Sequence, residues 1–152
     1  MNVPPRRDIS FYRRYDVLQW VNPSVMEMLE NTINWIEIPV HDFDRAKKFY
    51  SAIYDYEMPE TTVRDIRMGF LPYEQKEHRV GGAICLGQGY VPSLQGTLPY
   101  LNGGSDLTTV LNRIEKAGGK ILQPKTFLGE GIGYSALFTD TEGNRVALHS
   151  RK

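Results

Sequence analysis

The sequence lacks several features that would assign it to a class at once. It has one cysteine, Cys85, among 152 residues, so no internal disulfide can form and a small secreted disulfide scaffold is disfavoured. No apolar run approaches the roughly 20 residues that span a bilayer. Lysine plus arginine equals aspartate plus glutamate, 18 each, which gives no net charge for binding nucleic acid or an anionic membrane. We therefore expect a cytoplasmic protein with neither of these partners.

Familiar catalytic motifs are also missing. The chain contains no Gly-x-Ser-x-Gly elbow, no paired Cys-x-x-Cys and no His-Glu-x-x-His sequence. The stretch GQGYVP, residues 87–92, has two glycines but does not open a helix, so it does not predict a phosphate-binding loop. Cys85 has no cationic neighbour in sequence, which is typical of an inert core thiol rather than a nucleophile.

Residues 1–30 differ from the rest of the chain. They are basic and aromatic and show no clean hydrophobic period, although Ser24 and Glu27 form a capping-box pattern that predicts a short helix over residues 25–30. This segment is either a docking arm or a loosely held N-terminal extension. Both alternatives stay open on the sequence alone.

From residue 31 onward the chain predicts two similar modules. The first has a strand over residues 33–40, which places Ile36 and Ile38 on one face and Trp35 and Glu37 on the other. Asp42 or Asp44 then caps a helix with apolar residues at helical spacing. Three short strands follow, near residues 58–62, 65–71 and 79–87.

The same order returns after the Gly- and Pro-rich connector GQGYVPSLQG. A strand TLPYLN precedes a helix capped by Ser105 or Asp106, and strands follow near residues 120–124, 134–140 and 144–150. This duplication predicts an α+β fold of two tandem βαβββ modules, about residues 31–90 and 97–150, within a single domain over residues 31–152. We expect a half-open, cup-shaped mixed sheet with helices on its outer face.

Two stretches carry a resemblance to a known family. IPVHDFDRAKKFY in the first module, and GGKILQPKT with GYSALFTDTEGNRVALHS in the second, resemble the vicinal oxygen chelate superfamily of glyoxalases, bleomycin-resistance proteins and extradiol dioxygenases. The resemblance covers about residues 33–150. It implies paired modules that form a cup around a divalent metal ion, and that meet within one chain or across a homodimer.

The metal-ligand positions implied by the resemblance can be checked one by one. They fall on Trp35, within residues 81–87, on Leu98 or Pro99, and on Ala147, and Cys85 is the only residue near them that could ligate a metal. We therefore expect a member without the usual metal ligands and without a cofactor. This pattern favours the metal-free members that bind or sequester drugs.

Strand alternation gives a predicted lining for the cup. The lining residues are Trp35, Glu37, Leu98, Tyr100, Asn102 and His149. Trp35 offers a ring for stacking, or else fills the space of a lost metal. Glu37 can accept hydrogen bonds from a ligand or act as a general base, or it is a solvated or salt-bridged rim residue. His149 pairs with Glu37 as an acid–base dyad, or it is a frayed terminal histidine.

The sequence thus leaves two function classes open. The first is a metal-independent small-molecule binding protein, a homodimer, whose ligand is compact, partly apolar, and cationic or hydroxylated. The alternative is a lyase or isomerase that uses Glu37 as its base, with or without His149, or a glyoxalase-like enzyme with an atypical metal site. Binding needs only shape and a few polar contacts, whereas catalysis needs a base within reach of an abstractable proton.

Overall fold

The computed structural model describes residues 30–76 and 79–152. Within the described part, Asn31–Lys152 forms one compact unit. The predicted helix over residues 25–30 and the choice between arm and extension lie outside the described residues, apart from Glu30. No helix among the described residues combines the length and apolar character needed to cross a membrane.

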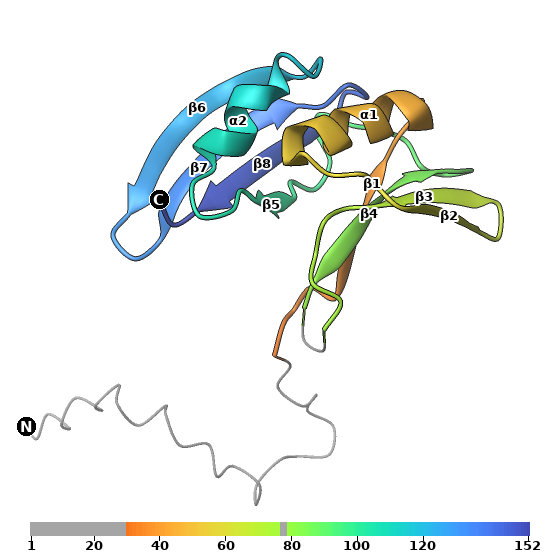
Figure 1. Ribbon diagram of the computed structural model, residues 1–152, viewed down its shortest axis with the longest axis horizontal. Helices are drawn as coiled ribbons and strands as arrows, with labels where there is room; N and C mark the ends of the chain where they lie inside the picture. The colour runs from red at the N-terminus through yellow and green to blue at the C-terminus, as the bar shows by residue number, and fades with distance from the viewer. Residues whose placement is uncertain (1–29, 77–78) are drawn as a thin grey trace, which may run out of the picture. The chain divides into compact units, whose positions relative to one another are not determined.

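The structure contains the two predicted βαβββ modules (Figure 1). The first consists of β1 (Trp35–Pro39), α1 (Phe43–Tyr54), β2 (Glu60–Val63), β3 (Ile66–Phe70) and β4 (Gly81–Leu86). The second consists of β5 (Tyr100–Asn102), α2 (Thr108–Ile114), β6 (Lys120–Gly129), β7 (Gly133–Thr139) and β8 (Arg145–Ser150). Sheet A has the strand order β1-β4-β3-β2, and sheet B has the order β5-β8-β7-β6. In each sheet the first strand of the module runs parallel to the last, and the other pairs are antiparallel.

The helices begin in different ways. Asp42 caps α1, because its side chain accepts a hydrogen bond of 3.0 Å from the Arg45 amide, as the sequence predicts. In α2 the N-cap is Leu107, and the prediction of a Ser105 or Asp106 cap is wrong. Asp106, one position before the N-cap, nevertheless accepts a hydrogen bond of 2.9 Å from the amide of Thr108, the first residue of α2.

The predicted alternation along β1 is confirmed by burial. Ile38 is buried in a hydrophobic core that draws residues from both modules, whereas Glu37 is exposed on the opposite face of the strand. The two helices lie side by side over this core (Figure 1). Phe49 of α1 and Phe138 of β7 pack with ring centroids 6.1 Å apart. Among residues 30–76 and 79–152, no helix covers the other face of either sheet.

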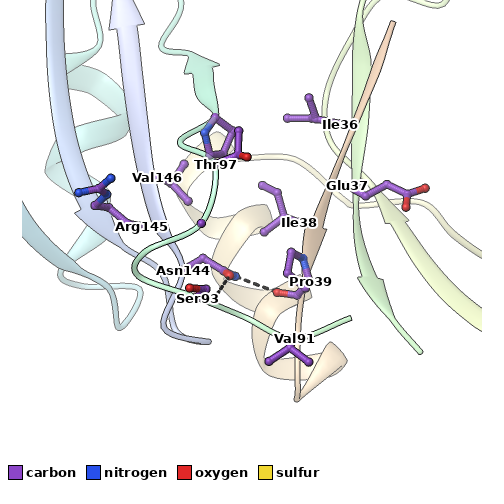
Figure 2. A pocket seen from close by; sticks show the side chains of 12 residues that line it. Ile36, Glu37, Ile38, Pro39, Val91, Ser93, Thr97, Asn144, Arg145 and Val146 are labelled. Atoms are coloured by element: carbon purple, nitrogen blue, oxygen red, sulfur yellow. Dashed lines mark hydrogen bonds between the residues drawn. The ribbon is translucent and has the colours of Figure 1, made fainter. Parts of the chain in front are cut away.

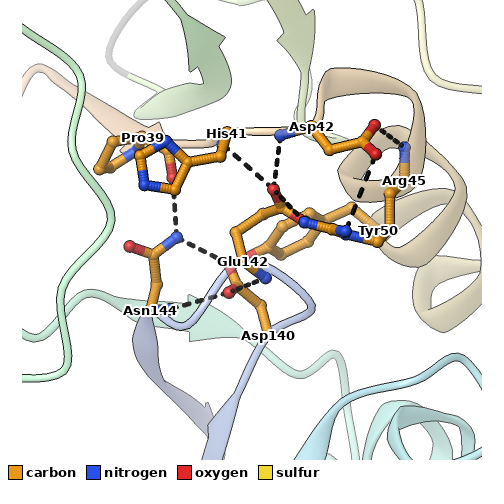
Figure 3. A network of polar contacts seen from close by, with 8 residues as sticks. All are labelled: Pro39, His41, Asp42, Arg45, Tyr50, Asp140, Glu142 and Asn144. Atoms are coloured by element: carbon orange, nitrogen blue, oxygen red, sulfur yellow. Dashed lines mark hydrogen bonds and ion pairs between the residues drawn. The ribbon is translucent and has the colours of Figure 1, made fainter.

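A polar network fixes the first module against the second (Figure 3). The Glu142 side chain, in the turn between β7 and β8, is 0% exposed and accepts hydrogen bonds from the His41 and Asp42 amides, 3.1 and 2.7 Å long. It also accepts one of 2.7 Å from Arg45 Nε. The Asn144 amide group donates to the Pro39 carbonyl at 2.8 Å. These bonds hold the end of β1 beside the beginning of β8.

Candidate functional site

Three aromatic rings gather on the open face of sheet A. Trp35 on β1 packs edge-on against Phe70 of β3 and Tyr73, with centroid distances of 6.1 and 5.8 Å. Gly81 lies opposite Trp35 in the β1–β4 register. A Cβ at this glycine would lie 2.7 Å from Trp35 Cζ3 and 2.8 Å from Tyr73 Cζ, so only glycine leaves the rings room. We call Trp35, Phe70 and Tyr73 the aromatic trio.

A carboxylate shares this face with the aromatic trio. Glu37 lies two residues beyond Trp35 on β1 and is exposed. Its Oε2 accepts a hydrogen bond from the hydroxyl of Tyr90 in the connector. This hydrogen bond is the main cause that raises the pKa of Tyr90 to about 12, and so the phenol stays neutral and the carboxylate keeps a donor at neutral pH.

The single cysteine lies close to the same face but is not available for chemistry. Cys85 on β4 is buried, and burial is the main cause that raises the pKa of its thiol to about 12, with the negative charge of Glu37 adding to it. A thiol in this state is a poor nucleophile and a poor metal ligand. The structure therefore agrees with the interpretation of Cys85 as a core residue.

A second group of predicted residues lies on sheet B. Asn102 of β5 and His149 of β8 are register partners, and Tyr100 pairs with Ala147. Tyr100, Asn102 and His149 line a hollow of about 630 Å³ together with Arg151. His149 Nε2 lies 2.8 Å from the Ile132 carbonyl oxygen, which orients the ring.

Five of the six predicted lining residues thus fall into two groups in the described chain. Trp35 and Glu37 share the face of sheet A, and Tyr100, Asn102 and His149 share the hollow on sheet B. Leu98 is half-buried just before β5 and is not among the residues that line the hollow.

The predicted Glu37–His149 dyad has no direct contact within the described residues. Glu37 bonds to Tyr90, and His149 bonds to the Ile132 carbonyl. Nothing in the described contacts joins the two side chains as an acid–base pair within one chain.

Sequence reasoning missed part of the site. Phe70 could have been found from the sequence. It lies on β3, where it is the register partner of Ala83 on β4, and strand alternation puts its side chain on the same face as Trp35. Tyr73 and Tyr90 could not, since both lie outside strands, where no periodicity fixes the direction of a side chain. Arg151 follows β8, so no strand alternation predicted that it would line the hollow on sheet B.

The residues at the implied metal positions do not fit a divalent ion. Trp35, Ala147, Pro99 and residues 81–87 offer no imidazole or carboxylate donor. Among residues 30–76 and 79–152, no three His, Cys, Asp or Glu side chains form a cluster that could hold a metal. This face carries aromatic rings and the Glu37 carboxylate instead.

The family model described as "Glyoxalase/Bleomycin resistance protein/Dioxygenase superfamily" matches residues 32–148. A "Glyoxylase-like domain-containing protein" from Didymella fabae is 30% identical over 130 residues, which cover 82% of this chain and 97% of the relative.

Solved structures with the same fold are more distant in sequence. A glyoxalase/bleomycin resistance protein from Albidiferax ferrireducens T118 has a TM-score of 0.61 at 16% identity, over 80% of this chain and 100% of the other. TnmS3, an antibiotic binding protein from Streptomyces sp. CB03234, has a TM-score of 0.55 at 19% identity, over 83% and 100%. At these identities the likeness shows the fold alone.

Proposed function

The chain belongs to the Glyoxalase/Bleomycin resistance protein/Dioxygenase superfamily, and on this basis we propose that it is a metal-independent binding protein for a small molecule. Its ligand is compact and partly apolar, and carries an ammonium or hydroxyl group. The observation that carries this proposal is the position of the Glu37 carboxylate beside the aromatic trio on one open sheet face.

The aromatic trio supports an apolar, planar body for the ligand. Trp35 and Tyr73 are half-buried, so each presents part of its ring to the open face. Rings in edge-on contact with each other keep a fixed orientation and can stack on an aromatic ligand with little loss of side-chain freedom. The face is therefore preorganised for a flat ligand.

The carboxylate supports a polar group at one end of the ligand. Glu37 is exposed, and its described partner is the neutral hydroxyl of Tyr90, so its negative charge is not cancelled by an ion pair within the described residues. An ammonium group receives both the charge of Glu37 and the negative faces of nearby rings. A ligand hydroxyl can donate to the same oxygen, although without the attraction between charges.

A homodimer would bring the two groups of predicted residues together. The face of sheet A carries Trp35 and Glu37, and the hollow of sheet B carries Tyr100, Asn102 and His149. We propose that sheet A of one protomer faces sheet B of its partner, so that each ligand is enclosed from both sides. The antibiotic-binding function stated for TnmS3, which shares this fold, supports sequestration as the role.

Calorimetric titration with a matched pair of probes tests the proposal. Tyramine carries an aromatic ring and an ammonium group, and tyrosol replaces the ammonium group by a hydroxyl. We expect metal-depleted protein to bind both compounds, tyramine more tightly. Binding of neither, or binding that appears only after a divalent metal is restored, contradicts the proposal.

A further inference from the structure

A separate cavity lies beside β1, toward the second module (Figure 2). Its volume is about 330 Å³, which lies at the lower end of the range for small-molecule sites, about 300–1,000 Å³. Its walls are the following residues of β1, the connector and the start of β8: Ile36, Glu37, Ile38, Pro39, Val91, Ser93, Gly96, Thr97, Pro99, Asn144, Arg145 and Val146. We call it the seam cavity.

The seam cavity has no charged side chain directed into it among the described residues that line it. Glu37 and Arg145 are part of its wall, but both side chains point away from it (Figure 2). Of the apolar wall residues, Ile36 is half-buried, whereas the Ile38 and Val146 side chains are 3% and 0% exposed and belong to the core behind the cavity. Burying an unpaired charge in such surroundings costs free energy, so this cavity favours an uncharged occupant with apolar surface.

The wall formed by β1 offers unpaired backbone groups. The Val40 amide donates to the Cys85 carbonyl at 2.9 Å, so the even-numbered residues of β1 direct their N–H and C=O groups to β4. The odd-numbered residues direct theirs to the opposite edge. The Pro39 carbonyl shows this, because it accepts its hydrogen bond from Asn144 in the second module.

Glu37 is the next odd-numbered residue along this open edge. Its N–H and C=O face the seam cavity, while its side chain faces the aromatic trio. β1 pairs with β4 alone, and neither backbone group of Glu37 has a partner within the described residues. An extended residue at a strand edge presents a donor and an acceptor side by side, the pattern that pairs with another extended amide.

The opposite wall belongs to the connector and adds hydroxyl groups. The connector is held to β8 by hydrogen bonds from the Arg145 and Ala147 amides to the Ser93 and Pro99 carbonyls, 3.3 and 2.9 Å long. Ser93 and Thr97 are part of this wall, and the Ser93 hydroxyl accepts a hydrogen bond of 3.0 Å from the Gln95 amide. The cavity therefore combines an apolar floor, a strand edge and hydroxyl groups.

We propose that the seam cavity is a second binding site, for an uncharged apolar amide about one amino-acid residue long. The amide pairs with the N–H and C=O of Glu37 as an added strand residue, and its apolar side chain packs on the half-buried side chain of Ile36. This site is separate from the face that binds through the Glu37 carboxylate.

The test uses N-acetyl-leucine N′-methylamide, which is uncharged and presents the amide pair of one extended residue. Titration into ¹⁵N-labelled protein is expected to shift the Glu37 and Thr97 amide resonances in a saturable way. The same compound methylated at the leucine nitrogen lacks the donor to the Glu37 carbonyl, and we expect it to bind at least tenfold more weakly.

Variants locate the binding. Val91 is 66% exposed at the cavity, so Val91→Trp fills the cavity without disturbing the core, and it should weaken binding at least tenfold. Arg145→Gln is the matched control, because that side chain points away, and it should leave the affinity within twofold. A saturating amount of tyramine should not displace the amide.

Three results would overturn the proposal. These are no saturable shift of the Glu37 amide at the solubility limit of the probe, equal binding of the N-methylated compound, and full affinity in Val91→Trp.

Discussion

The Tyr90 hydroxyl donates a hydrogen bond to the Glu37 carboxylate across the open face of sheet A. The two residues are 53 positions apart, and the bond ties the connector to the first strand. It holds the carboxylate beside the aromatic trio while leaving its charge uncancelled. The binding proposal depends on this arrangement.

Removal of the charge at Glu37 should weaken binding of the cationic probe selectively. In Glu37→Gln we expect tyramine affinity to fall about fivefold to tenfold, since an exposed ion pair contributes ~1 kcal/mol. Tyrosol affinity should change by less than twofold, because a neutral amide still accepts its hydrogen bond. Calorimetry measures both values.

Glu57→Gln, an exposed carboxylate beyond α1, is the control and should leave both affinities as they are. Equal losses for tyramine and tyrosol in Glu37→Gln would show that charge is not what Glu37 contributes.

A methyl group at Gly81 should disturb the aromatic trio. The added Cβ would come within 3.0 Å of Trp35 and Tyr73, and relief of such overpacking costs about 1–3 kcal/mol. We therefore expect Gly81→Ala to lower the free energy of unfolding in urea by this amount and to weaken tyrosol binding. Gly96→Ala, whose Cβ would have no neighbour nearer than 3.7 Å, should be stable. A Gly81→Ala protein with full stability and affinity would mean that the rings are not closely fitted.

The contact between Arg45 and Glu142 should make stability depend on acid pH. Burial alone would raise the pKa of the Glu142 carboxyl, but hydrogen bonds from Arg45 and the Asp42 amide outweigh this effect and the pKa is lowered from 4.5. A carboxyl with a lowered pKa stabilises the folded state above its unfolded pKa. This contribution is lost as the pH falls below about 4.5 through the folded pKa.

Glu142→Gln should therefore lower the free energy of unfolding at pH 7 by about 2 kcal/mol, as for a lost hydrogen bond to a charged group. The difference from the wild-type protein should shrink as the pH drops below 4.5. Urea denaturation at several pH values measures it. Glu60→Gln is the control, because this exposed carboxylate also pairs with Lys47 and Arg67 but is not buried, and its effect should be smaller. A pH-independent difference would assign the loss to packing rather than to charge.

Cys85 should resist thiol reagents in the folded protein. Burial and the raised pKa of its thiol, about 12, keep it protonated at pH 8. We expect reaction with Ellman's reagent to be slow without denaturant and complete in urea. Fast labelling of the native protein would show that the face of sheet A opens as far as β4.

The sequence predicted those parts of the fold that follow from short-range patterns. Alternation placed Glu37 and Ile38 on opposite faces of β1, and the helix cap was narrowed to Asp42 or Asp44, of which Asp42 is the cap. The last two strands, predicted near residues 134–140 and 144–150, were also predicted correctly. Each of these features depends on residues that are neighbours along the chain.

The contacts that complete the site join distant segments, and short-range patterns do not reveal them. Tyr90 reaches Glu37 only because the connector folds back toward β1, and Glu142 is buried only because the two modules meet. The sequence assigned Glu37 and His149 to one cup, but strand register places them on two sheets. In the homodimer that we propose, Glu37 of one protomer and His149 of its partner would lie on facing sheets.

The most direct test of the central claim is an ¹⁵N–¹H spectrum of metal-depleted protein during titration with tyramine. Our account predicts saturable shifts of the Trp35 indole and Gly81 amide signals, with no change when a divalent metal is added back. Shifts confined to other regions, or shifts that require the metal, would contradict it.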